Sequence, residues 1–388
     1  MRISAVLALA ATSFLSASAD FVDVIDFTNL GFQGYYYDVK AFKDVTKDSC
    51  TCERGDAVSF KGPNAPLNEA LSVHFRGPLV LNEFAYYTTD LFTLGLSSSS
   101  SWNRLTYYNA EKQVGENITF LTTAGEYSPC LGYALTFAGA NGTSAAKKAT
   151  LLESNNKIYS NEEYAIFSNV SCDSSGPNND CGVYRSGIPA FQGFAGTVKM
   201  FLFDFEMPTE DKLSSDVSNY DMPAIWLLNA KIPRTAQYSN NVNCSCWRSG
   251  CGEFDVFEIM NTTEALNLYS TVHDYQGTGD IQNGIAADKF IERDLTGNMK
   301  GGVVFDLNGN AAVFVSNSTR FDSTISGSDI NSWISKASAD GGSVSTALSS
   351  ATNPLPSSTS KKSGGANVTP SIFTNFVVGV LGLVYGLF

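Results

Sequence analysis

Short stretches in which apolar and polar residues alternate recur along most of the chain, with Gly, Pro, Asn and Ser between them. A period of two is typical of β-strands, whose successive side chains point to opposite faces. After strands and turns in 21–37, the pattern predicts strands at 67–75, 79–88, 102–108, 117–122, 131–142, 164–170, 196–207, 222–230, 253–260, 266–274, 301–308 and 311–317. The tripeptide Asn308-Gly309-Asn310 predicts a hairpin turn between the last two strands.

Helical spacing is rare along the same chain. Residues 147–160 fit either a short helix or a loop. Many short strands joined by regular turns indicate an all-β sandwich or barrel. From residue 323 the composition shifts to Ser, Ala, Thr, Gly and Pro, and residues 335–365 carry too little apolar surface to build a core. We therefore predict a disordered, O-glycosylated stalk over 323–365.

Both ends of the chain have the pattern of targeting signals. Residues 1–19 join a basic start, an apolar middle and the small residues Ala17-Ser18-Ala19, which predicts a secretory signal peptide. Residues 376–388 are apolar but short for a membrane span, and a polar spacer and small residues precede them. This order predicts a glycosylphosphatidylinositol (GPI) anchor signal over 366–388, attached at Ser363 or Gly364. Such an anchor would hold the protein at the cell surface.

Composition narrows the class of partner. The chain has 388 residues, enough for one large β-domain or two smaller ones. Its net charge of −13 argues against nucleic acids and anionic membrane surfaces as partners. Sugars are neutral, so the acidity does not count against a carbohydrate ligand. We expect a monomer.

Eight cysteines in a secreted chain imply disulfides rather than metal thiolates: Cys50, Cys52, Cys130, Cys172, Cys181, Cys244, Cys246 and Cys251. Cys172 and Cys181 bracket a polar loop, so we predict a local disulfide there, with pairing elsewhere as the alternative. The last three cysteines superficially resemble a metal cluster, but disulfides and no metal are expected in an oxidising compartment. One of those three should pair with Cys50, Cys52 or Cys130, and the connectivity stays open.

Asn-X-Ser/Thr sequons are dense, as in a glycosylated surface protein. Six are predicted to carry glycans, at Asn117, Asn141, Asn169, Asn243, Asn261 and Asn317. A seventh, at Asn367, would be lost with the anchor signal.

Three acids stand close together in the predicted strand at 253–260. Glu253 and Asp255 share a face of a regular strand, whereas Glu258 points the other way. One β-bulge between Asp255 and Glu258 would bring Glu258 back to that face, and three carboxylates would then line one wall. The plain alternative is an edge strand whose acids only face solvent.

Such acids could cleave a glycosidic bond with retention, which needs two carboxyl groups about 5 to 5.5 Å apart. Glu253 and Glu258 could fill these roles, and Asp255 between them would raise their proton affinity by charge repulsion. Trp226 and Trp247 could stack on sugar rings, or could simply be core residues. His273 could hydrogen-bond a carboxylate, or could be structural.

Other chemistries fit less well. The chain has no Gly-x-Ser-x-Gly elbow and no Walker or dinucleotide glycine motif. Two histidines in all leave few options for catalytic triads or zinc sites. No cofactor is expected.

The acid strand resembles a known signature. Glu253-Phe-Asp-Val-Phe-Glu258 is similar to the Glu-x-Asp-x-x-Glu motif of glycoside hydrolase family sixteen, and the segments 223–228 and 271–273 resemble its flanking strands. The Cys244-Ser-Cys-Trp-Arg-Ser-Gly-Cys-Gly-Glu-Phe-Asp255 segment resembles, more specifically, the Tos-type family of fungal cell-wall glycosyl hydrolases. Cys50-Thr-Cys52 and the segment 74–79 fit that family's N-terminal region, and the likeness covers roughly residues 21–335.

This resemblance implies a concanavalin-like β-jelly-roll sandwich over 83–322, after a small β-rich N-terminal region at 20–82. It implies a β-1,3-glucan substrate and retaining hydrolysis or transglycosylation at the fungal cell surface. By motif position, Glu253 would be the nucleophile, Asp255 its helper and Glu258 the acid/base. Residues before Met200 look little like ordinary family-sixteen enzymes, so sugar subsites do not carry over. A non-catalytic glucan-binding module and a structural wall glycoprotein are the alternatives.

Overall fold

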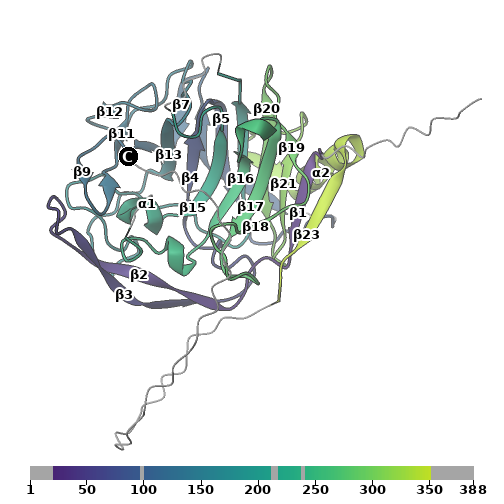
Figure 1. Cartoon of the computed structure of the whole chain (residues 1–388). Coiled ribbons are helices and arrows are strands. Elements are labelled where there is room, and N and C mark those ends of the chain that lie inside the picture. The colour runs from purple at the N-terminus through teal and green to yellow at the C-terminus, as the bar shows by residue number, and fades with distance from the viewer. Residues whose placement is uncertain (1–20, 97–99, 211–216, 237–240, 351–388) are drawn as a thin grey trace, which may run out of the picture. The chain divides into compact units, whose positions relative to one another are not determined.

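The computed structural model describes residues 21–96, 100–210, 217–236 and 241–350, which form a mostly β structure with two large sheets (Figure 1). The predicted signal peptide and anchor signal, with Ser363 and Gly364, lie outside the described residues. One sheet has nine strands, in the order β22 (Thr324–Ser326), β6 (Ser101–Asn109), β5 (Val80–Thr88), β14 (Lys199–Glu206), β20 (Met299–Phe305), β21 (Ala311–Val315), β1 (Val24–Thr28) and β23 (Ser343–Ala347), with β7 (Val114–Glu116) beside β6.

The second large sheet has ten strands, and the acid strand, β16, is one of its interior strands. Its order is β12 (Ala145–Ala146), β11 (Thr136–Ala138), β8 (Ile118–Thr122), β13 (Glu163–Ser168), β4 (Leu71–Arg76), β15 (Ala224–Asn229), β16 (Glu253–Ile259), β17 (Asn267–His273) and β18 (Ile285–Ala286), with β19 (Ile291–Glu292) beside β17. The predicted strand at 131–142 is divided: its first part is β10, outside this sheet, and its second part is β11.

The main core lies between the two sheets. Aromatic pairs join them: Phe205 of β14 lies 5.2 Å from Phe257 of β16, and Phe305 of β20 lies 5.8 Å from Phe254. Each of these rings is fully buried, which contributes about 1.5–3 kcal/mol per side chain. The predicted strands thus form a two-layer sandwich. One face of the acid strand packs into the core between the layers.

Two small hairpins and four short helical segments complete the described chain. The hairpins are β2 (Gly34–Lys43) with β3 (Thr51–Phe60), and β9 (Tyr127–Ser128) with β10 (Gly132–Tyr133). The helical segments are α1 (Lys231–Thr235), α2 (Gly327–Gly341) and the 3₁₀ turns η1 (Trp247–Ser249) and η2 (Thr262–Glu264). Residues 147–160 form a loop, and the predicted turn at 308–310 is present, with Gly309 at φ +78°.

The predicted boundary between an N-terminal region and the main domain does not coincide with a division between the sheets. It falls inside β5, and β1 and β4 belong to different large sheets. Within residues 21–82, only the β2–β3 hairpin lies outside the two large sheets, along one side of the sandwich (Figure 1). The strands β1, β4 and the start of β5 are part of the sandwich itself.

The predicted stalk also begins too early, because residues 324–347 form β22, α2 and β23. Ser326 caps α2 by accepting a hydrogen bond from the Asp329 backbone N–H. Ile330, Trp333 and Ala337 then pack on the outer face of the nine-stranded sheet. Spacings of three and four residues place these few apolar side chains on one helix face, which suffices despite the polar composition.

The last described residues are fastened to the first strand. β23 pairs with β1 in parallel, Val24 opposite Ser343 through Thr28 opposite Ala347. Just beyond β23, Asn29 Nδ2 donates to the Leu348 carbonyl at 2.9 Å, and Gln276 Nε2 donates to the Ser349 carbonyl at 2.8 Å. Among the described residues, no helix is long and apolar enough to cross a membrane.

All eight cysteines form disulfides: Cys50–Cys130, Cys52–Cys244, Cys172–Cys181 and Cys246–Cys251. The local pair Cys172–Cys181 is confirmed, as is the prediction that one cysteine of the acid-strand segment pairs with an N-terminal one. Cys52–Cys244 ties the β2–β3 hairpin to the segment that leads into β16.

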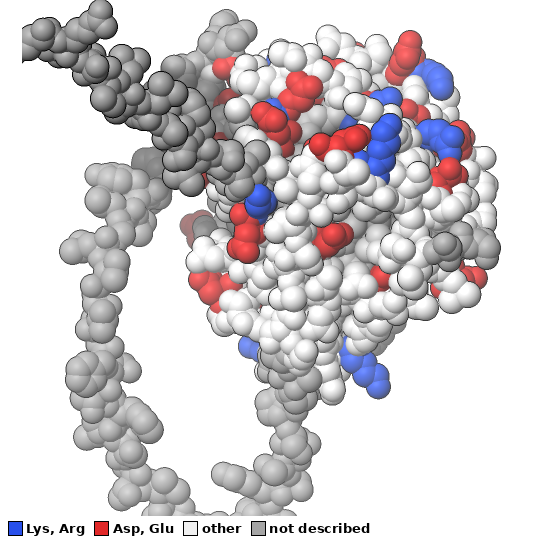
Figure 2. Space-filling view, turned by 90° about the vertical axis from the view of Figure 1, so that its right-hand side faces the viewer, with Lys and Arg blue, Asp and Glu red and all other residues white. Residues whose placement is uncertain are grey.

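Two features of the surface bear on the sequence analysis. The six predicted glycosylation residues are exposed: Asn117, Asn141, Asn169, Asn243, Asn261 and Asn317. On the face in Figure 2, acidic and basic side chains are interspersed among neutral residues, so the net charge of −13 is not gathered into one patch there.

Candidate active site

The bulge that the acid strand requires is present in β16. Trp226 of β15 lies opposite Asp255, and Ile225 lies opposite Phe257, so Val256 is the extra residue. The register with β17 shifts in the same interval, between Asp255 and Glu258. Val256 and Phe257 consequently both enter the core, while Asp255 and Glu258 both face the cleft.

A cleft of about 320 Å³ lies on the outer face of the ten-stranded sheet. It brings together all six residues that the sequence singled out for the site: Trp226, Trp247, Glu253, Asp255, Glu258 and His273. Arg76 of β4 is a further lining residue. The acids are therefore not on a solvent-facing edge strand, which removes that alternative.

Asp255 is fixed by His273 from the next strand. His273 Nε2 lies 2.8 Å from Asp255 Oδ2, and His273 Nδ1 lies 2.7 Å from the Ile281 carbonyl oxygen. A carbonyl only accepts, so Nδ1 carries a proton, and both ring nitrogens donate when the imidazole is charged. This pair anchors the middle carboxylate of the three.

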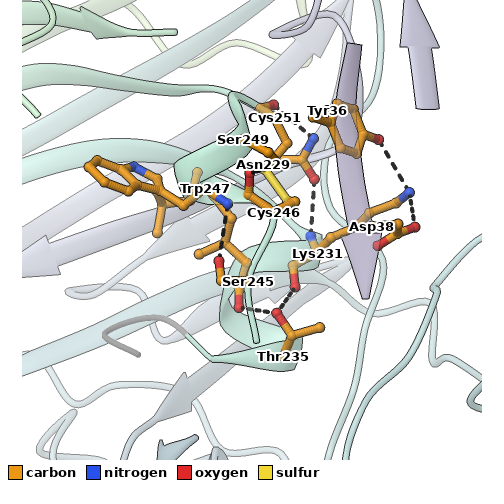
Figure 3. Close-up of a disulfide and its surroundings, with 12 residues drawn as sticks. Tyr36, Asp38, Asn229, Lys231, Thr235, Ser245, Cys246, Trp247, Ser249 and Cys251 are labelled. Atoms are coloured by element: carbon orange, nitrogen blue, oxygen red, sulfur yellow. Dashed lines mark hydrogen bonds and ion pairs between the residues drawn. A yellow bond between two sulfur atoms is a disulfide. The ribbon is translucent and has the colours of Figure 1, made fainter. Parts of the chain in front are cut away.

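Glu253 receives a hydrogen bond from the indole N–H of Trp247. Trp247 opens η1, which the Cys246–Cys251 disulfide closes into a tight loop (Figure 3). Figure 3 also shows how the neighbouring helix is held: Lys231 of α1 contacts both Tyr36 and Asp38 of β2. The cysteines of this segment thus position an aromatic wall of the cleft.

Glu258 forms an ion pair with Arg76, whose Nη2 lies 2.9 Å from Glu258 Oε1. Arg76 is itself oriented by donating from Nε to the Met222 carbonyl at 2.7 Å. The sequence reading missed this arginine. The available signal was an arginine at the end of the apolar strand 71–76, but nothing local indicated which acid it would meet.

Burial and the neighbouring Asp255 together set the pKa values of Glu253, Glu258 and His273. Burial, and then the charge of Asp255, raises the pKa of Glu253 to about 8, against the Trp247 hydrogen bond and His273. The same two causes raise the pKa of Glu258 to about 7, against Arg76. Burial acts to lower the pKa of His273, but Asp255 outweighs it and raises that pKa to about 10.

The cleft favours one shared proton among its acids. Burial and the repulsion between neighbouring carboxylates both raise the proton affinity of Glu253 and Glu258. That proton belongs to Glu253 or Glu258, because the pKa of each is raised into the neutral range. One protonated and one ionised carboxyl group is the combination that acid-assisted glycoside cleavage requires.

A β-sandwich that presents this carboxylate cluster between tryptophan side chains has a site of the glycoside-hydrolase class. Sequence comparison identifies the family. The chain belongs to the cell wall protein YJL171C/Tos1 family, whose N-terminal part matches residues 23–89 and whose C-terminal part matches residues 100–333.

Named relatives extend over nearly the whole chain. The "Probable circularly permuted 1,3-beta-glucanase PGA52" of Candida albicans is 58% identical over 384 residues, which cover 99% of both chains. The "Probable circularly permuted 1,3-beta-glucanase YJL171C" of Saccharomyces cerevisiae is 54% identical, over 88% of this chain and 87% of its own. Comparison with solved structures finds no match.

Proposed function

We propose that the protein is a cell-wall β-1,3-glucanase that works with retention, as a hydrolase or a transglycosylase. The names of its relatives support the substrate. The observation that carries the proposal is the bulge in β16, because it directs Glu253, Asp255 and Glu258 into one cleft.

The proposed reaction needs the shared proton on Glu258, although the pKa of Glu253 is the higher of the two. Ionised Glu253 attacks the anomeric carbon while Glu258 gives its proton to the departing glycosidic oxygen. Water or an acceptor sugar hydroxyl then attacks the glycosyl-enzyme, Glu258 takes the proton of that nucleophile, and Glu253 is released. Asp255 is held in place by His273, and its charge raises the pKa of both Glu253 and Glu258, so that one of them keeps a proton. Arg76 favours the charged form of Glu258, so protonation of that acid weakens the ion pair.

We further propose that the two-sheet sandwich is a concanavalin-like jelly roll and that the site is related to glycoside hydrolase family sixteen. A circularly permuted order is supported by the pairing of β1 with β23, which places the two ends of the described chain side by side. In such a permuted chain, β4 would bring Arg76 to the cleft from the N-terminal side of the sequence.

The proposed protein is monomeric, leaves the cell through its signal peptide, and is retained by the GPI anchor at Ser363 or Gly364 on the membrane or the wall glucan. The cell-wall family supports this location. Phospholipase release of the protein from intact cells tests the anchor.

Product analysis tests the activity most directly. The secreted protein should cleave or transfer laminari-oligosaccharides, and NMR of the first products should show the β-anomer. Release of the α-anomer would exclude retention, and longer products would identify transfer.

The Arg76–Glu258 ion pair favours a second candidate, a glucan-binding module without turnover, because it favours the charged form of the acid. Binding of laminari-oligosaccharides with no product from any β-glucan would establish that candidate. Neither binding nor turnover would indicate a structural wall glycoprotein.

A further inference from the structure

A second groove, of about 450 Å³, lies between the β2–β3 hairpin and the segment that carries η1. Its lining includes three half-buried tyrosines, Tyr35, Tyr37 and Tyr275, and two exposed arginines, Arg54 and Arg248. None of these residues contacts the carboxylates of β16 in a hydrogen bond or ion pair that the described structure records. The groove is thus built mainly by parts of the chain outside the two large sheets.

The groove adjoins the catalytic cleft. Val242, Ser245 and Arg248 line both. Trp247 faces the cleft, and its η1 neighbour Ser249 faces the groove. A linear ligand that binds at the carboxylates could therefore extend past η1 and contact the β2–β3 hairpin.

The tyrosines of the groove are held in fixed positions. The rings of Tyr35 and Tyr37 meet edge to face at 5.5 Å, and the Arg54 guanidinium lies over the Tyr37 ring. Tyr275 donates from its hydroxyl to the Arg248 carbonyl at 2.7 Å. Its ring packs on Gly250, where a Cβ would come within 2.6 Å of Tyr275 Cδ2.

The hairpin that carries Tyr35 and Tyr37 is fastened to the site. Ser249 Oγ accepts from the Tyr37 backbone N–H at 2.9 Å, and Lys231 bonds Asp38 at 2.8 Å. The Cys52–Cys244 disulfide adds a covalent link to the same segment. An aromatic surface that is already ordered loses little conformational entropy when a ligand binds, which favours ligand binding at this groove.

We propose that this groove is a distal subsite that binds the continuation of the same neutral β-glucan chain that occupies the cleft. Tyrosine rings stack on the apolar faces of sugars, and arginine N–H groups donate to their hydroxyls. The net charge of −13 disfavours an acidic polymer, and the adjoining cleft points to a neutral glucan as the occupant. The inference rests on the proposed function, because it extends the ligand of that site.

Ligand length tests the subsite. The full secreted chain carrying Glu253→Gln, which should bind but not cleave, is titrated calorimetrically with laminaribiose and with laminarihexaose. Adding Tyr35→Ala and Tyr37→Ala should weaken hexaose binding about tenfold and leave biose binding unchanged. The single variant Tyr35→Ala should show the same selectivity to a smaller extent, should the double change disturb the hairpin.

The matched control is Tyr127→Ala with Tyr133→Ala. These tyrosines form another edge-to-face pair, 5.1 Å apart, on the β9–β10 hairpin, and line neither the cleft nor the groove. Both affinities should be unchanged in that control.

Two results would overturn the subsite while the proposed function stands: unchanged hexaose binding in both groove variants, or equal losses for the two ligands. A glycan at Asn243, on the groove rim, would be the alternative occupant in the first case. Absence of binding by the Glu253→Gln parent to either ligand would instead refute the proposed substrate, and the subsite with it.

Discussion

Arg76 of β4 holds Glu258 of β16 in an ion pair at 2.9 Å, across 182 positions of sequence. The guanidinium favours the charged form of Glu258 and so opposes the rise in its pKa that burial causes. If Glu258 is the acid, its pKa sets the alkaline limit of activity. Arg76 would then tune the pH range of the enzyme without touching the bond that breaks.

Arg76→Met should move the alkaline limb of the pH–activity profile upward, by about one pH unit or more, because loss of the cation raises the pKa of Glu258. Initial rates on laminarin between pH 4 and 9 give the profile. Arg76→Lys keeps the charge and should stay closer to the wild type. An alkaline limb that does not move in Arg76→Met would show that Glu258 is not the titrating acid.

Glu253→Gln and Glu258→Gln should each reduce turnover of laminari-oligosaccharides by at least about a thousandfold, since each amide removes one carboxyl role. Rates of reducing-end release measure the loss. The control is Glu264→Gln, which changes an exposed acid in η2 outside the cleft. Full activity in either cleft variant, with an unchanged unfolding temperature, would refute the site assignment.

Stability should fall as pH rises. The pKa values of Glu253 and Glu258, about 8 and 7, lie above the ordinary 4.5, so their contribution is complete below pH 4.5 and is lost as pH rises through those values. The raised pKa of His273, about 10 against 6.5, acts with the same sign over a higher window. The unfolding temperature should therefore drop by at least about 2 °C between pH 5 and pH 9.

Scanning calorimetry of the wild type and of Glu253→Gln checks this dependence. The variant lacks one of the buried titrating groups, so its unfolding temperature should decline less steeply over the same pH range. A wild-type unfolding temperature that rises from pH 5 to pH 9 would contradict the prediction.

The Cys52–Cys244 disulfide should stabilise the protein more than Cys172–Cys181, because it closes a separation of 192 residues rather than 9. Replacing Cys52 and Cys244 by Ala should cost about 3–5 kcal/mol, and replacing the local pair about 2–3 kcal/mol. Chemical denaturation measures both losses. Equal losses would mean that strain or residual structure, rather than loop closure, decides the effect.

Much of the site could be predicted from sequence because its signal is local. Glu253, Asp255 and Glu258 stand within six positions, and Val256 and Phe257 between the last two acids are both apolar, which a regular half-buried strand does not permit. A bulge resolves that conflict, and the structure contains it. His273 and Trp226 could be assigned to the site because their strands, β17 and β15, neighbour β16 both in the sheet and in the sequence.

The rest depended on long-range pairing. β4 inserts between β13 and β15, so Arg76 reaches Glu258 through a sheet order that no local pattern encodes. The helix α2 was hidden by its Ser, Ala and Asp residues, although Ser326, Ile330 and Trp333 have the spacing of a capped amphipathic helix. The β1–β23 pairing likewise joins segments about 320 residues apart, and composition alone placed the second of them in a stalk.

The parallel β1–β23 pairing also bears on mechanics. If the proposed GPI anchor is attached, tension on it would reach the described fold just after β23. Pulling β23 along its own axis would shear all its hydrogen bonds with β1 at once instead of unzipping them singly. Asn29 and Gln276 add hydrogen bonds to the carbonyls of Leu348 and Ser349, where the chain leaves β23. The fold would then resist tension from a growing or swelling wall at this edge of the sheet, away from the cleft.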